Sequence, residues 1–162
     1  LFPYTTLFRS NRIVEMEANM ERLVHTHQFH HTTITHLHQL RDILWSPRTL
    51  SIALSNTDLV HGDFSADNVF LHQNQDSFLI MDWQRPMIGA KLIDEYMFHS
   101  SLGATPSPEA SLIGIIFQID WLVDCAVHWF PEGMKTYDLQ IKDFIGQVTN
   151  VYQALKPNKT IS

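Results

Sequence analysis

The spacing of apolar residues predicts a mainly helical chain. Apolar side chains recur every three or four positions, the period of an amphipathic helix, in residues 11–27, 33–44, 92–102 and 137–155. Ser46-Pro47 is a start signal for a further short helix, because proline is tolerated in the first helical turn.

A long apolar segment, residues 112–130, has the length of a membrane span. Gln118, Asp120, Asp124 and His128 interrupt it, and two carboxylates in a lipid core would be costly. We therefore expect a buried helix with one polar edge, and no association with a membrane.

Between the helical segments, two short apolar runs predict a β-hairpin. Residues 69–71 and 78–81 have the length of strands, and the polar residues 73–76 between them suit a turn. A turn centred on residue 74 or 75 pairs Asn68 with either Met81 or Asp82. Paired residues have Cβ atoms roughly 5 Å apart, so the side chains of Asn68 and Asp82 can approach a common point.

The residues at the open end of this hairpin indicate metal-assisted chemistry. The amide oxygen of Asn68 and the carboxylate of Asp82 suit a hard cation such as Mg²⁺. Asp63 precedes Asn68 by a short loop and can bring a second carboxylate beside them. Phosphoryl transfer needs this combination, because metal ions neutralise the phosphates while a carboxylate orients the attacking hydroxyl.

The same residues resemble a known family. The motif His-Gly-Asp at residues 61–63, followed by four variable residues and Asn68, looks like the catalytic loop of the aminoglycoside phosphotransferase and choline kinase-like superfamily. The sequence Ile-Met-Asp-Trp at residues 80–83 is similar to the metal-binding strand end of that family. Gly89 and Asp94 resemble its later Gly…Asp element.

The resemblance implies an α+β, mainly helical fold, namely the C-terminal lobe of a protein-kinase-like fold with a small catalytic β-hairpin. It implies an enzyme that transfers the γ-phosphate of ATP or GTP to a hydroxyl of a small molecule, with Mg²⁺ as cofactor. Asp63 would be the catalytic base or hydroxyl-orienting residue, and Asn68 and Asp82 would hold the magnesium. His61 would pack behind the catalytic loop, and Asp94 would brace it.

The acidic pair Asp120 and Asp124 has two interpretations. The residues lie one turn apart and share a face of the predicted helix. In resembling enzymes that bind cationic substrates, acidic residues on this lobe contact amines, which makes the pair a candidate substrate pocket. A solvent-exposed edge is the favoured interpretation.

Residues 1–10 resemble the translation of a sequencing-adapter oligonucleotide, and we expect them to be non-native. Residues 11–162 are then expected to form the catalytic-loop lobe. The amino-terminal lobe of such enzymes supplies a strand lysine, a helix glutamate and a phosphate-covering loop. No such pattern precedes the catalytic loop, so we expect this lobe to be missing and the chain alone to be inactive.

Composition narrows the classes of partner and location. The formal net charge of −6 argues against a nucleic-acid partner, because phosphate binding needs a basic face. Cys125 is the only cysteine, which excludes an internal disulfide and favours a reducing, cytoplasmic location. Six histidines in residues 25–38 are expected to form a solvated surface rather than a metal site.

Two alternative functions stay open. A kinase-like binding module without turnover would keep the fold, although the three retained site residues count against it. A metal-dependent hydrolase would use His61, Asp63 and Asp82 as ligands. It would need further histidine ligands, for which only His72 and His99 are at hand.

Overall fold

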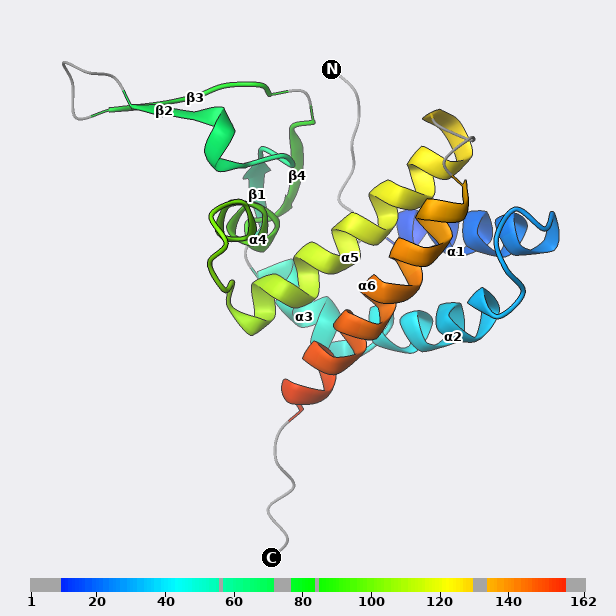
Figure 1. The fold of residues 1–162 in the computed structure, drawn as a ribbon. Coiled ribbons are helices and arrows are strands. Elements are labelled where there is room, and N and C mark those ends of the chain that lie inside the picture. The colour runs from blue at the N-terminus through cyan, green and yellow to red at the C-terminus, as the bar shows by residue number, and fades with distance from the viewer. Residues whose placement is uncertain (1–9, 56, 72–76, 84, 130–133, 157–162) are drawn as a thin grey trace, which may run out of the picture.

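The computed structural model describes residues 10–55, 57–71, 77–83, 85–129 and 134–156. It has an α+β fold that is mainly helical, as the sequence predicts (Figure 1). The helices within these ranges are α1 Ser10–His25, α2 Thr33–Leu44, α3 Pro47–Ser55, α4 Leu92–Ser101, α5 Pro108–Asp124 and α6 Met134–Ala154. Of the segment predicted to be non-native, residues 1–9 lie outside the described residues, and Ser10 begins α1.

Helix α5 forms the centre of the fold. It contacts α1, α3, α4 and α6, and in Figure 1 α6 runs beside it. The helix begins at a cap, because the hydroxyl of Ser107 accepts a hydrogen bond from the backbone N–H of Ala110 and Pro108 takes the first position. A π-helical turn, η2 Cys125–Trp129, continues it.

Burial explains the apolar character of this helix. Among the described residues one helical stretch, Pro108–Trp129, is long and apolar enough to cross a membrane, and 67% of its most apolar 18-residue window is buried within the protein. Ile113, Ile116 and Ile119 have at most 1% of their surface exposed. The predicted buried helix is therefore confirmed.

Helices α4 and α5 approach each other at Gly114. A Cβ atom placed on this glycine would lie 2.1 Å from the ring of Tyr96 on α4, far inside any allowed contact. The absence of a side chain lets the tyrosine ring pack directly on the backbone of α5. This contact fixes α4, which carries one of the candidate site residues.

Four short strands form two separate antiparallel pairs. They are β1 Thr57–Val60, β2 Val69–Leu71, β3 Phe78–Ile80 and β4 Met87–Ala90. β2 pairs with β3, while β1 pairs with β4 (Figure 1). Strand β4 was not predicted, and it closes a pairing with β1 that spans the whole of the intervening hairpin.

The register of the predicted hairpin is confirmed. Val69 pairs with Ile80, and the N–H of Met81 donates to the carbonyl oxygen of Asn68 at 2.9 Å. Asn68 is therefore opposite Met81, the first of the two partners that the sequence allows. The predicted turn, residues 73–76, lies outside the described residues.

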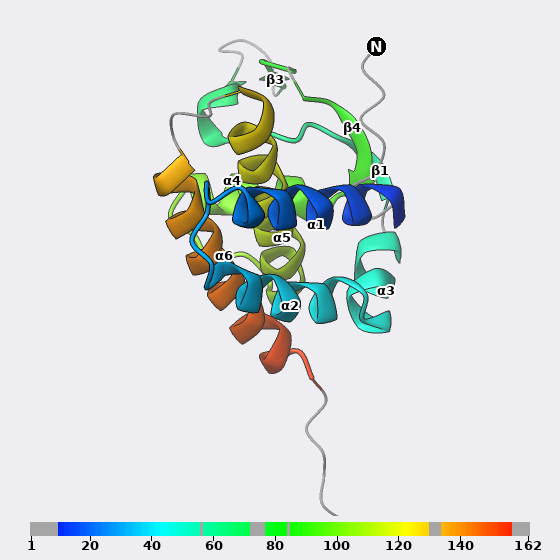
Figure 2. The same ribbon diagram turned by 90° about the vertical axis from the view of Figure 1, so that its right-hand side faces the viewer.

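The early helices stack as an antiparallel pair. α1 and α2 run side by side in Figure 2, with the segment that joins them beside α6. Their predicted positions are close to the observed ones, and α2 has the predicted bounds. Five of the six early histidines are exposed and His36 is half-buried, which agrees with the predicted solvated surface.

Candidate active site

Asp94 ties the loop after β1 to helix α4. Its Oδ2 accepts a hydrogen bond from the backbone N–H of His61 at 2.8 Å, and its Oδ1 accepts one from the N–H of Gly62 at 3.0 Å. Burial raises the pKa of Asp94, and these two backbone hydrogen bonds act in the opposite direction. Both carboxylate oxygens thus hold the backbone that leads into Asp63.

His61 connects this loop to the end of β3. Its side chain is buried, with 2% of the residue exposed. Nδ1 accepts a hydrogen bond from the backbone N–H of Asp63 at 3.3 Å, so Nε2 carries the proton and donates it to the carbonyl oxygen of Met81 at 2.8 Å. Trp83 packs against the imidazole with the ring centroids 4.6 Å apart. Both ring nitrogens are therefore used within the protein.

Asn68 joins the same two segments from the other side. Its side-chain Nδ2 donates to the carbonyl oxygen of Asp63 at 2.9 Å, and its own carbonyl oxygen accepts from Met81. Because the amide nitrogen is used in this way, the amide oxygen is the atom that Asn68 could offer to a cation. Asn68 sits at the end of η1 Ala66–Asn68, a 3₁₀ turn that leads directly into β2.

Asp82 has an unusual backbone conformation. Its φ angle is +63°, in the left-handed region that non-glycine residues rarely adopt. Asp82 directly follows Met81, which is held by both His61 and Asn68. Such strained positions persist where the surrounding structure enforces them, and they cluster at functional sites.

Gly62 cannot be replaced without strain in this loop. Its φ angle is +78°, and a Cβ atom here would lie 2.6 Å from the carbonyl oxygen of Arg85. The glycine of the His-Gly-Asp motif therefore has a structural reason, since it lets the loop pass close to the chain after β3.

The structure holds the backbone of Asp63 beside Asn68, and the residue before Asp82 pairs with Asn68 at the open end of the hairpin. Asp63 is half-buried and Asp82 is exposed. Among the described residues, no group of three or more His, Cys, Asp or Glu side chains could hold a metal. The oxygen donors that remain are an amide and a carboxylate, a set whose chemistry suits Mg²⁺ when substrate oxygens and water supply the other ligands.

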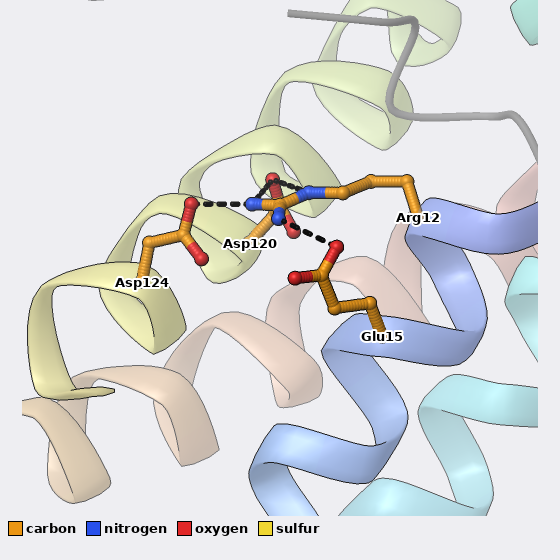
Figure 3. A network of polar contacts seen from close by, with 4 residues as sticks. All are labelled: Arg12, Glu15, Asp120 and Asp124. Carbon is orange, nitrogen blue, oxygen red and sulfur yellow. Dashed lines mark hydrogen bonds and ion pairs between the residues drawn. The ribbon is translucent and has the colours of Figure 1, made fainter. Parts of the chain in front are cut away.

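The acidic pair on α5 lies elsewhere and is engaged by a basic residue. Arg12 of α1 reaches Asp120 with Nη2 at 2.9 Å and Nε at 3.2 Å, and the same guanidinium contacts Asp124 (Figure 3). Glu15 lies 3.3 Å from Nη1 of Arg12. The second carboxylate oxygen of Asp120, Oδ1, is buried without a hydrogen-bond partner.

The favoured interpretation of Asp120 as part of a solvent-exposed edge is wrong. Only 7% of the residue is exposed, because α1 covers this face of α5. Desolvation raises the pKa of Asp120 to about 7, although Arg12 acts to lower it. Burial also acts to lower the pKa of Arg12, but the two carboxylates more than offset this, and the guanidinium stays charged. A substrate contact at this pair stays a prediction.

Sequence reasoning missed Arg12 and Arg85. Arg12 is separated from Asp120 by 108 positions, and no local pattern links them. The guanidinium carbon of Arg85 lies 3.6 Å from the ring centroid of Trp121, which attaches the segment before β4 to α5. No pattern in the sequence indicated either of these two contacts with α5.

Comparisons with known proteins return nothing for this chain. A scan against protein-family models finds no match, and searches of curated proteins and of solved structures find none either.

Proposed function

We propose that this chain is the catalytic-loop lobe of a phosphotransferase that moves the γ-phosphate of ATP or GTP to a hydroxyl of a small molecule. The observation that carries the proposal is a pair of hydrogen bonds at Asn68: its Nδ2 donates to the carbonyl oxygen of Asp63, and its carbonyl oxygen accepts from the N–H of Met81. These bonds hold the backbone of Asp63 beside Asn68 and place the residue before Asp82 opposite it. Phosphoryl transfer relies on such positioning more than on covalent chemistry.

The roles follow from the side chains. Asp63 would orient the acceptor hydroxyl and take its proton as the oxygen attacks the phosphorus. Asn68 and Asp82 would hold Mg²⁺, which neutralises charge on the phosphates. His61 and Asp94 would act only as positioning residues, because their polar side-chain atoms bind the backbone of the loop and of Met81.

Exposed apolar side chains on the hairpin support a further part of the proposal. Phe70, Leu71, Phe78 and Leu79 are each at least half exposed. An apolar patch of this kind is typical of a surface that another domain or partner covers. We propose that the nucleotide-binding lobe of the complete enzyme packs here, and that the chain alone lacks activity.

The two alternatives receive less support. A hydrolase with His61 as a metal ligand conflicts with its ring nitrogens, which already accept from Asp63 and donate to Met81. A binding module without turnover is consistent with the same geometry. Nucleotide binding without turnover in the natural gene product would favour that module.

The test uses the natural gene product that contains residues 11–162. ATP- and GTP-dependent phosphorylation of choline, aminoglycosides and other small alcohols would be followed by release of the nucleoside diphosphate. Asp63→Asn is expected to lower kcat about 100-fold or more, the usual contribution of a general base. Asp67→Asn is the matched control, because Asp67 is an exposed carboxylate of the same loop.

The same assay separates the metal ligands from the base. Asp82→Asn is expected to raise the Mg²⁺ concentration that half-maximal activity requires, whereas Asp67→Asn leaves it unchanged. Equal kcat values for the natural protein and Asp63→Asn would refute the assignment of the base. Robust turnover by residues 1–162 alone would refute the proposal that a second lobe is needed.

A further inference from the structure

A cavity of about 520 Å³ lies between the α1–α2 connection and the first half of α6. This volume is in the range of small-molecule sites. Figure 2 shows the connection running beside α6 at this point. The cavity shares no residue with the candidate active site.

Three histidines from the connection line the cavity, namely His27, His30 and His31. From α6, the lining includes Asp138 and Lys142 as charged residues. The ring centroids of His30 and His31 are only 4.2 Å apart.

The single carboxylate of the lining is already used by the protein. Oδ1 of Asp138 accepts from the hydroxyl of Thr33 at 2.6 Å, and Oδ2 accepts from Lys142 at 2.8 Å and from the backbone N–H of His30 at 3.4 Å. Asp138 is buried, with 6% of the residue exposed. The polar groups left for a ligand are therefore mainly donors.

The tautomer of His30 also leaves a hydrogen-bond donor for a ligand. Its Nδ1 accepts a hydrogen bond from the backbone N–H of Thr32 at 3.3 Å and lies 2.8 Å from the hydroxyl of that residue. With Nδ1 used as an acceptor, the neutral ring carries its proton on Nε2. The neutral ring of His30 thus offers an N–H donor.

Phe29 and Leu139 contribute apolar groups to the wall, and Gln28 completes the lining. The side chain of Phe29 is buried there, and Leu139 of α6 lines the cavity while remaining 67% exposed. An exposed leucine next to N–H donors suits a ligand with an apolar body and an anionic end.

We propose that this cavity binds a small organic anion, with its acidic group on His27, His30, His31 and Lys142 and its apolar part against Phe29 and Leu139. Asp138 stays paired with Lys142, so the lining presents no free carboxylate that would repel the anion.

The test is calorimetric titration of the whole chain with benzoate at pH 7.0 and constant salt. We expect saturable binding. His30→Ala is expected to weaken this binding by about 10-fold, the loss of one charge-assisted hydrogen bond. His38→Ala is the matched control, because His38 is an exposed histidine of α2 outside the cavity.

Two further titrations test the apolar wall. Leu139→Ser should weaken benzoate binding while leaving the affinity for inorganic phosphate unchanged. Leu139 is 67% exposed, so this substitution opens no cavity in the core. Phosphate that binds as tightly as benzoate would overturn the assignment of an apolar ligand. No saturable benzoate binding, or equal weakening by His30→Ala and His38→Ala, would overturn the site itself.

Discussion

Asp120 should make the stability of this protein fall as the pH rises. Its carboxyl group is buried beneath α1, and burial raises its pKa from 3.8 to about 7. Between these two values the folded protein holds a proton that the unfolded chain has released. The folded state then binds more protons than the unfolded state, so the free energy of unfolding decreases with increasing pH in that window and levels off above it.

The size of this effect follows from the width of the window. Each pH unit within it changes the free energy of unfolding by about 1.4 kcal/mol. Because the slope falls to about half at the upper end of the window, the loss attributable to Asp120 over pH 5 to pH 7 is about 2 kcal/mol. Asp120→Asn mimics the protonated group and should abolish this part of the slope, while its amide oxygen can still accept from Arg12.

Urea unfolding followed by tryptophan fluorescence would measure the slope, since Trp121 adjoins Asp120 in the chain. The variant keeps all ten histidines, so the difference between the two pH curves isolates the aspartate. Asp42→Asn, an exposed change on α2, should keep the slope of the unchanged protein. Parallel curves for the unchanged protein and Asp120→Asn would refute the reasoning.

The glycines provide the remaining predictions. Gly62→Ala should destabilise the fold by about 2 kcal/mol or more, because it adds a backbone clash to the positive φ, whereas Gly103→Ala has the positive φ alone and should cost about 1 kcal/mol. Gly114→Ala should cost about 1–3 kcal/mol through overpacking against α4, whereas Gly146→Ala in the open interior of α6 should raise stability by up to about 1 kcal/mol. Chemical unfolding of the four variants checks both pairs, and equal effects within either pair would contradict the cause given.

Local patterns predicted the helices and the hairpin well, because their signals lie within short windows. The period of apolar residues locates α2, and the two apolar runs set the β2–β3 register that puts Asn68 opposite Met81. The position of Asp82, next to the partner of Asn68, follows from that register. A sequence pattern is sufficient where the partners are close in the chain.

The sequence alone did not predict the contacts between segments that are distant in the chain. Strand β4 has only four residues and pairs with β1 across the whole hairpin, so its partner gives no local signal. The burial of Asp120 depends on α1, because Arg12 supplies the charge that makes a buried carboxylate tolerable. An acidic pair on a helix predicts a solvent-exposed edge unless the helix that packs over it is known.

The two hydrogen bonds from Asp94 have a consequence for amide exchange in the loop. Loop amides usually exchange with solvent through small local fluctuations. The amides of His61 and Gly62 are bound to a side chain in the first turn of α4, so they can open only when the loop separates from that helix. These two amides should therefore exchange together, at a rate set by the docking of α4.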